Sequence, residues 1–218
     1  MQASLPFTQD APADVPGLRF VPEFLSAAEE QALLRAIDGL ELVQAQYKQY
    51  TARRRVASFG GKFDYDTNEL RPAPPIPDSL APLRARVAQW LGVDPARFAH
   101  LMVAEYRPGT PLGWHRDVPD FESIVGVSLL GTAHMKFRPY PHAPGRAGKS
   151  VTLELPPRSA YVLEGPVRWQ WQHSIAETAE LRYSISLRTR RGTPLLLPPG
   201  PSDPTAVSSR QPRRFPPA

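Results

Sequence analysis

The second half of the chain reads LMVAEYR (101–107), SIVGVSLL (123–130), HMKFRPY (134–140), SVTLEL (150–155), SAYVLE (159–164) and LRYSISLRTR (181–190). These short runs are rich in β-branched and aromatic residues and are separated by proline, glycine and polar residues, a pattern typical of strands. Helical segments do not alternate with them, so a parallel sheet built from βαβ units is not expected. The runs predict six or more antiparallel strands arranged as a barrel or sandwich.

Two helices are predicted ahead of these strands. Ser26 and Glu29 form a capping-box pattern at the start of the helical run SAAEEQALLRAIDGL (26–40). The run DSLAPLRARVAQWLG, from Asp78 to Gly92, predicts a second helix. Helices followed by a block of strands indicate the α+β class.

The composition limits the chemistry that the protein can use. With 218 residues, 41% of them hydrophobic and 22% charged, the chain is expected to form one soluble globular domain with tails. Cysteine is absent, which excludes disulfides, thiolate zinc sites, iron–sulfur clusters and a cysteine nucleophile. Any metal must therefore bind histidine or carboxylate. No apolar run approaches the roughly 20 residues of a membrane span, and the N-terminus lacks a secretory signal, so we expect a cytoplasmic location.

The positive charge is concentrated at the C-terminus. The net charge is +5, and residues 190–218 hold five arginines and a single acid, Asp203, so they carry four of these charges. Residues 194–218 also contain eight prolines. We predict a flexible segment at 1–16, a folded domain at 17–193 and a disordered, proline-rich basic tail at 194–218. A tail that binds a partner domain through its prolines is the alternative to a solvated tail.

A histidine and an aspartate mark a candidate metal site. His115 and Asp117 are two residues apart, so on an extended segment their side chains point to the same side. His173 lies in WQWQHSI (169–175), shortly before the last predicted strand, and offers a third ligand. Two histidines and one carboxylate are a frequent ligand set of non-haem Fe(II), while zinc with three protein ligands and a water is the competing interpretation. We read His134 and His142 as structural or solvent-facing.

Two arginines share one face of the last predicted strand. Arg182 and Arg188 are six residues apart, an even spacing, while Tyr183, Ile185 and Leu187 point the other way. Guanidinium groups on a buried face need anionic partners, and bidentate pairing favours carboxylates. A solvent-exposed face is the alternative. Together with the candidate ligands, the pair predicts a dicarboxylate co-substrate.

In this order, His115-x-Asp117, His173 and Arg182-x5-Arg188 resemble the AlkB branch of the Fe(II)- and 2-oxoglutarate-dependent dioxygenases. The run EYRPG (105–109) is similar to the family segment whose tyrosine helps to hold 2-oxoglutarate. The runs RRRVASFG (53–60) and FDY (63–65) are similar to the lid over the substrate base. The resemblance covers roughly residues 19 to 190.

The resemblance implies a fold and a set of functional residues. The fold is a double-stranded β-helix (jelly-roll) with the N-terminal helices packed on one sheet. The iron ligands would be His115, Asp117 and His173, and these would also be the catalytic residues. The groups that bind 2-oxoglutarate would be Tyr106, Arg182, Ser184 and Arg188. Residues assigned to the substrate are Arg53, Arg55, Phe59, Tyr65, Trp114 and Arg138.

Three positions depart from the family pattern. Ala104 and Ser184 stand where many members have asparagine, so two amide groups that would hydrogen-bond near the co-substrate are lost. Pro119 stands where several members have an acid, a role that Asp120 or Glu122 can take over. None of the three changes the metal ligands.

The resemblance implies oxidative demethylation of alkylated nucleobases in DNA or RNA, a dealkylation repair reaction that releases formaldehyde, succinate and CO2. A flipped base would enter an aromatic pocket, and arginines would meet phosphates. The alternatives are a protein hydroxylase or demethylase with the same chemistry, and a binding module that has lost turnover. We expect a monomer that acts on nucleic acid and not on membranes.

Overall fold

The computed structural model describes residue 12 and residues 14–47, 50–64, 67, 69–141 and 150–192. The tail predicted at 194–218 lies outside these residues, as does most of the segment 1–16. Tyr65 and His142 also lie outside them.

Two main helices precede most of the sheet. Helix α1 (Ala27–Asp38) begins at Ser26, whose side chain accepts from the Glu29 backbone while the Glu29 carboxylate accepts from the Ser26 backbone, so the predicted capping box is confirmed. Helix α2 (Ala81–Leu91) ends at Gly92, which has a left-handed φ of 67°. Its start differs from the prediction. Asp78 opens a 3-10 turn, η1 (Asp78–Leu80), and α2 follows with a proline in its first turn, where a missing N–H is tolerated.

The strands form two main antiparallel sheets and a small hairpin. One sheet has seven strands in the order β1-β11-β8-β13-β6-β3-β2, the other has four in the order β10-β9-β12-β7, and β4 pairs with β5. The bounds are β1 Leu18–Val21, β2 Val43–Tyr47, β3 Tyr50–Phe59, β4 Gly61–Asp64, β5 Glu69–Pro72, β6 Phe98–Tyr106, β7 Leu112–His115, β8 Phe121–Leu130, β9 Ala133–Pro139, β10 Val151–Leu155, β11 Ala160–Leu163, β12 Trp171–Ile175 and β13 Arg182–Arg190. Short helices η2 (Pro95–Arg97) and α3 (Pro166–Gln170) precede β6 and β12.

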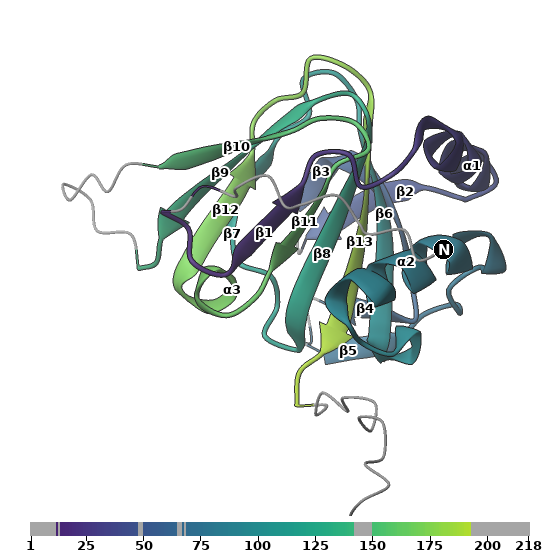
Figure 1. Ribbon diagram of the computed structural model, residues 1–218, viewed down its shortest axis with the longest axis horizontal. Coiled ribbons are helices and arrows are strands. Elements are labelled where there is room, and N and C mark those ends of the chain that lie inside the picture. Colours follow the sequence, from purple (N-terminus) through teal and green to yellow (C-terminus); the bar gives the residue numbers. More distant parts are fainter. Residues whose placement is uncertain are drawn as a thin grey trace, which may run out of the picture.

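The seven-stranded sheet separates two hydrophobic cores. Helices α1 and α2 cover one face, and the four-stranded sheet lies on the other (Figure 1). Buried residues of both helices, such as Leu33 and Val87, pack with Val103 and Ile185 of the sheet in the helix-side core. A second core lies between the two sheets; its residues include Phe20, Phe121, Met135, Phe137, Leu155 and Ile175. This arrangement is the jelly-roll with helices on one sheet, and it confirms the predicted fold class.

The core between the sheets also includes a residue ahead of the predicted domain start. Val15 is only 2% exposed and packs in this core. The backbone N–H of Val167 donates to the carbonyl oxygen of Pro16 at 2.9 Å. The packed domain therefore reaches at least to Val15.

Strand β13 contributes to both cores. Ile185 and Leu187 are fully buried and pack on the helix side, with Tyr183 beside them. Arg182 and Arg188 lie on the opposite face, 1% and 8% exposed. The predicted alternation is therefore confirmed, and the arginine face is buried and not solvent-exposed. We call the face of the seven-stranded sheet that looks toward the four-stranded sheet its inner face.

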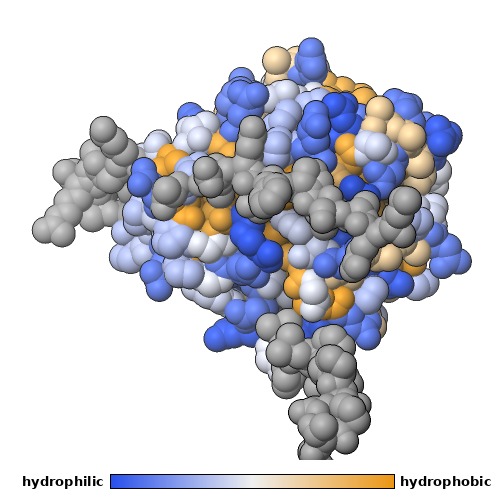
Figure 2. All heavy atoms as spheres, in the orientation of Figure 1, coloured by the Kyte–Doolittle hydropathy of each residue, from blue (hydrophilic) through white to orange (hydrophobic). Residues whose placement is uncertain are grey.

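The surface of the described part is mixed in polarity. Hydrophilic residues cover most of the visible face, with smaller apolar patches between them (Figure 2). Within the same part of the chain, no helix is both long and apolar enough to cross a membrane.

Candidate active site

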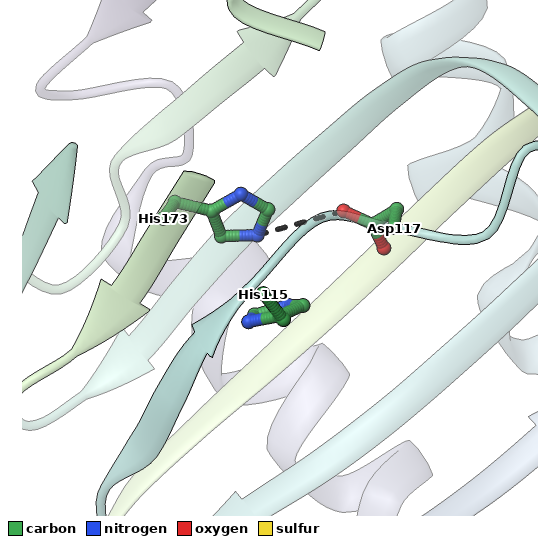
Figure 3. A group of neighbouring side chains, drawn as sticks. All are labelled: His115, Asp117 and His173. Atoms are coloured by element: carbon green, nitrogen blue, oxygen red, sulfur yellow. Dashed lines mark ion pairs between the residues drawn. The ribbon is translucent and has the colours of Figure 1, made fainter. Parts of the chain in front are cut away.

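Two neighbouring strands bring the candidate metal ligands together. His115 ends β7 and His173 lies in the middle of β12, and the two residues are directly opposite in the antiparallel register. Their ring centroids are 4.2 Å apart. Asp117 follows on the loop, and its Oδ2 lies 3.5 Å from Nε2 of His173 (Figure 3). One donor atom from each of the three residues lies within 4.8 Å of the others.

The ionisation of these groups suits metal binding. Burial lowers the pKa of His115, and burial together with the nearby His115 lowers the pKa of His173 to about 3. Burial alone raises the pKa of Asp117, but the charge of Arg188, followed by those of the histidines, holds it well below its usual range. At neutral pH the site therefore presents two neutral imidazoles and one carboxylate, the forms that bind a cation.

A hydrogen bond defines which nitrogen of His115 faces the site. Its Nδ1 lies 2.9 Å from the carbonyl oxygen of Gly113, which can only accept. Nδ1 therefore carries the proton, and Nε2 keeps its lone pair for a metal. With neutral nitrogen and carboxylate donors and no thiolate in the chain, this set fits Fe(II).

Arg188 fixes the orientation of Asp117. Its Nε and Nη2 donate to Oδ1 of Asp117 at 3.3 and 3.1 Å, while Nη1 donates to Nδ1 of His100 at 3.0 Å and to the Ser186 hydroxyl at 2.8 Å. Four of the five guanidinium hydrogens are thereby engaged. Oδ1 is held by the arginine, so Oδ2 is the oxygen left for a metal. Arg188 thus positions the carboxylate of the candidate metal site.

The sequence analysis missed His100. It lies on β6 directly opposite Arg188 and is 5% exposed. Burial, and then the charge of Arg188, lowers its pKa to about 3, so the ring is neutral and its Nδ1 lone pair accepts from Arg188. The signal was its position six residues before Tyr106, an even spacing that places both side chains on the inner face.

Arg182 is buried on the inner face, where it lies opposite Tyr106 on β6. Its Nε donates to the Ser128 hydroxyl at 2.9 Å, its Cζ lies 5.2 Å from the Tyr106 ring centroid, and its Nη1 has no hydrogen-bond partner in the described part of the chain. Tyr161 is buried nearby, and this burial raises its pKa to about 12. A fully buried N–H without an acceptor is costly. The group therefore fits a carboxylate of 2-oxoglutarate.

Tyr161 was also missed, and a glycine makes room for it. A Cβ on Gly126 would lie 2.3–2.4 Å from three atoms of the Tyr161 phenol. The two residues are paired across β8 and β11. Only this long-range pairing reveals the role of Gly126, since nothing in its own strand marks it.

Ser184 lies between the two arginines. It faces the same side of β13 and is opposite Ala104 on β6 and Ser128 on β8. It is 8% exposed. Its predicted contact with 2-oxoglutarate stays a proposal.

The residues assigned to the substrate are not gathered around the triad. Trp114 precedes His115 and so lies on the outer face of the four-stranded sheet. There the Arg138 guanidinium stacks 4.3 Å from its ring centroid and donates to Gln172 at 2.9 Å. Phe59 packs in the helix-side core. None of these three side chains faces the triad, and their contact with the substrate stays a proposal.

Arg53 and Arg55 are engaged elsewhere. Arg55 donates to both carboxylate oxygens of Glu105, at 2.9 and 2.7 Å, and Arg53 donates to the carbonyl oxygen of Gly109 at 3.2 Å. Glu105 also accepts from Arg107 at 3.0 Å. Arg53 and Arg55 are therefore not part of a free basic surface.

A family model described as the 2OG-Fe(II) oxygenase superfamily matches residues 17–192. The chain belongs to this superfamily. It is accordingly an oxidoreductase, a 2-oxoglutarate-dependent dioxygenase that uses Fe(II), and the triad and the Arg182 site have the chemistry that these two groups need.

Its similarities point to the AlkB branch. The chain is 31% identical over 187 residues to the alkylated DNA repair protein ALKBH8 homolog of Arabidopsis thaliana, covering 76% of this chain and 52% of that protein. It is 33% identical over 166 residues to the tRNA (carboxymethyluridine(34)-5-O)-methyltransferase ALKBH8 of Macaca fascicularis, covering 73% of this chain and 24% of that protein. The chain thus spans about half of the first relative and about a quarter of the second.

Solved structures share the fold at low identity. The structure of OsALKBH1 superposes with a TM-score of 0.66 at 14% identity, over 84% of this chain and all of that one. A prolyl hydroxylase from Trichoplax adhaerens, in complex with a peptide fragment, superposes with a TM-score of 0.56 at 14% identity, over 81% of this chain and 84% of that one. At this identity the likeness supports the jelly-roll fold alone.

Replacing Gly126 by alanine tests the packing around Tyr161. The new methyl group would overlap the phenol, so we expect Gly126→Ala to lower the free energy of unfolding by about 1–3 kcal/mol. The displaced phenol should also raise the KM for 2-oxoglutarate. Gly113→Ala is the control for stability, because a Cβ there meets no atom within 4 Å. Equal unfolding midpoints for the two variants in urea would contradict this packing.

Acid titration tests the neutral, buried state of His100. The pKa is about 3 in the folded protein and near 6.5 when the chain is unfolded, so the unfolded state binds the additional proton as the pH falls below 6.5. Stability is therefore lost from about pH 6.5 down to 3, by up to roughly 1.4 kcal/mol per pH unit for this group.

The comparison for His100 uses metal-free protein. We expect His100→Gln to show a shallower loss of stability between pH 6.5 and 4 than the wild type, because glutamine does not titrate but can accept from Arg188. Urea unfolding in the presence of a chelator measures both curves. Parallel curves would show that His100 is not held neutral.

Proposed function

We propose that the chain oxidises an alkylated nucleobase in DNA or RNA and removes a methyl group from nitrogen, with formaldehyde, succinate and CO2 as products. The observation that carries this proposal is the combination of a two-histidine, one-carboxylate triad with an unpaired guanidinium nitrogen of Arg182 on the inner face. The names of the similar proteins, alkylated DNA repair and tRNA modification, support a nucleic-acid substrate.

Each group in the site has a proposed task. His115, Asp117 and His173 hold Fe(II), with Asp117 binding through Oδ2 because Arg188 holds Oδ1. Fe(II) and 2-oxoglutarate together supply the oxidising chemistry: one oxygen atom of O2 enters succinate as CO2 leaves, and the other hydroxylates the substrate C–H bond. A hydroxymethyl group on nitrogen then breaks down to formaldehyde and the free amine.

The co-substrate is held at its distal end by Arg182. We propose that its free Nη1 and the hydroxyls of Tyr106 and Tyr161 bind the carboxylate farther from the metal. Arg182 is 1% exposed, so water cannot replace the anion easily. The free-energy cost of burying the Arg182 guanidinium is then offset when 2-oxoglutarate binds. This favours binding of a dicarboxylate at this position.

Loss of the Arg182 charge tests this assignment. Truncating one partner of a buried charge pair costs about 2–5 kcal/mol, so we expect Arg182→Met to raise the KM for 2-oxoglutarate by roughly 30-fold or more. Succinate formation against 2-oxoglutarate concentration measures it. Arg182→Lys should recover part of the affinity, because lysine restores the positive charge but not the bidentate geometry of the guanidinium group. An unchanged KM in Arg182→Met would remove this residue from the co-substrate site.

Product analysis tests the reaction and the substrate class together. The protein with Fe(II), 2-oxoglutarate and ascorbate is incubated separately with N-methylated single-stranded DNA, N-methylated RNA and a methylated peptide. We expect formaldehyde and succinate in equal amounts from a nucleic acid, and neither from Asp117→Ala, because the carboxylate ligand is gone. Formaldehyde from the peptide alone would reject the nucleic-acid proposal in favour of a protein demethylase. Absence of succinate with every substrate would favour a binding module.

A further inference from the structure

Three consecutive arginines on β3 have different surroundings. Arg55 lies opposite Glu105 on β6 and is held by its carboxylate, and Arg53 donates to the carbonyl oxygen of Gly109. Arg54 lies between them and faces the other side of the strand. Because Arg55 and Glu105 lie on the helix side, next to Tyr183, Arg54 lies on the inner face, where Tyr106 lies.

Arg54 has no counter-charge. Its Nε is buried and has no hydrogen-bond acceptor, and within the described residues the side chain forms no ion pair. By the strand register Arg54 lies at the level of Tyr106, which is itself opposite Arg182 on β13. A buried guanidinium N–H without an acceptor is costly unless an anion or water binds there.

The other charges of the inner face do not supply this anion. Asp117 is the carboxylate of the triad, and Arg188 already neutralises it. Arg168 donates to the carbonyl oxygens of Val118 and Phe121 at 2.6 and 2.9 Å. Arg182 and Arg54 each keep a buried guanidinium nitrogen that has no partner among the described residues, and Nε of Arg168 is a third such nitrogen.

One dicarboxylate does not satisfy both. In the proposed function, 2-oxoglutarate binds Arg182 with its distal carboxylate and the metal with its keto acid end. Arg54 is still uncompensated when both carboxylates are in place. Arg54 is only half-buried, so an anion that belongs to the substrate can reach it from solvent.

We propose that Arg54 binds an oxyanion of the substrate close to the C–H bond that is oxidised, either a carboxylate on the modified base or the phosphate that flanks it. This inference rests on the proposed function for the identity of the polymer, but the anion site itself does not depend on it. The printed name of one similar protein, a tRNA (carboxymethyluridine(34)-5-O)-methyltransferase, refers to a base that carries a carboxymethyl group. Arg54 then selects substrates by charge, while Arg182 selects the co-substrate.

The first experiment measures turnover in Arg54→Gln, Arg54→Lys and, as a control, Arg35→Gln. Arg35 lies on α1, exposed, and its replacement changes the net charge equally. A charge-assisted hydrogen bond corresponds to roughly 10- to 100-fold in kcat/KM, so we expect a loss of this size for the substrate in Arg54→Gln. The KM for 2-oxoglutarate should stay within about twofold of wild type, and Arg54→Lys should recover part of the loss.

The choice of substrates separates the two sources of the oxyanion. Each enzyme is given single-stranded RNA carrying either a neutral methylated base or a base with a carboxymethyl group, and the corresponding free nucleosides, which lack phosphate. A loss confined to the carboxylated base, in RNA and nucleoside alike, identifies the carboxylate. A loss with both RNAs and neither nucleoside identifies the phosphate. Equal kcat/KM in wild type and Arg54→Gln for all substrates, or a rise in the 2-oxoglutarate KM, overturns the proposal.

A second experiment does not require activity and separates this proposal from the proposed function. Inorganic phosphate is titrated into protein loaded with Mn(II) and 2-oxoglutarate, so that Arg182 is already occupied, and thermal unfolding is followed. We expect phosphate to raise the Tm of wild type and Arg35→Gln but not of Arg54→Gln. If no nucleic acid is oxidised and this difference is seen, the nucleic-acid function fails while the anion site stands. Equal Tm shifts in all three proteins refute the site.

Discussion

The ion pair between Arg188 and Asp117 determines the state of the whole centre. The carboxylate is buried, and burial alone would protonate it; the guanidinium keeps it ionised and occupies Oδ1. Breaking such a pair on one side leaves an uncompensated charge in the interior. Arg188 is itself held by hydrogen bonds to His100 and Ser186. These two residues therefore help to fix the orientation of Asp117 through Arg188.

Strand β13 explains how this chemistry coexists with a stable core. Its odd-numbered residues complete the helix-side core, and its even-numbered residues supply both arginines to the inner face. This alternation could be predicted, because it depends only on spacing within one strand. His115 and Asp117 were predicted from the same spacing, although Asp117 lies on the loop after β7. His173 was predicted from its position shortly before the last strand, and it pairs with His115 through register.

The remaining residues depend on contacts between strands that are far apart in sequence. His100 opposite Arg188, and Gly126 beneath Tyr161, follow from pairings of β6 with β13 and of β8 with β11. The faces of some residues assigned to the substrate could have been recognised from spacing alone. Trp114 directly precedes a ligand and so had to face the other side, and the same rule shows that Arg54 is the arginine of its cluster that faces the centre.

Glu105 has a consequence for the specificity of the centre. It binds Arg55 of β3 and Arg107, and it accepts from the Tyr183 hydroxyl of β13, so it connects three neighbouring strands at one level. If β3 slipped by one residue, Arg54 would turn toward the helices, and Arg53 and Arg55 would turn to the inner face. The slip would break the ion pair between Glu105 and Arg55, which disfavours that register. A residue on the helix side of the sheet therefore determines how many arginines face the inner side.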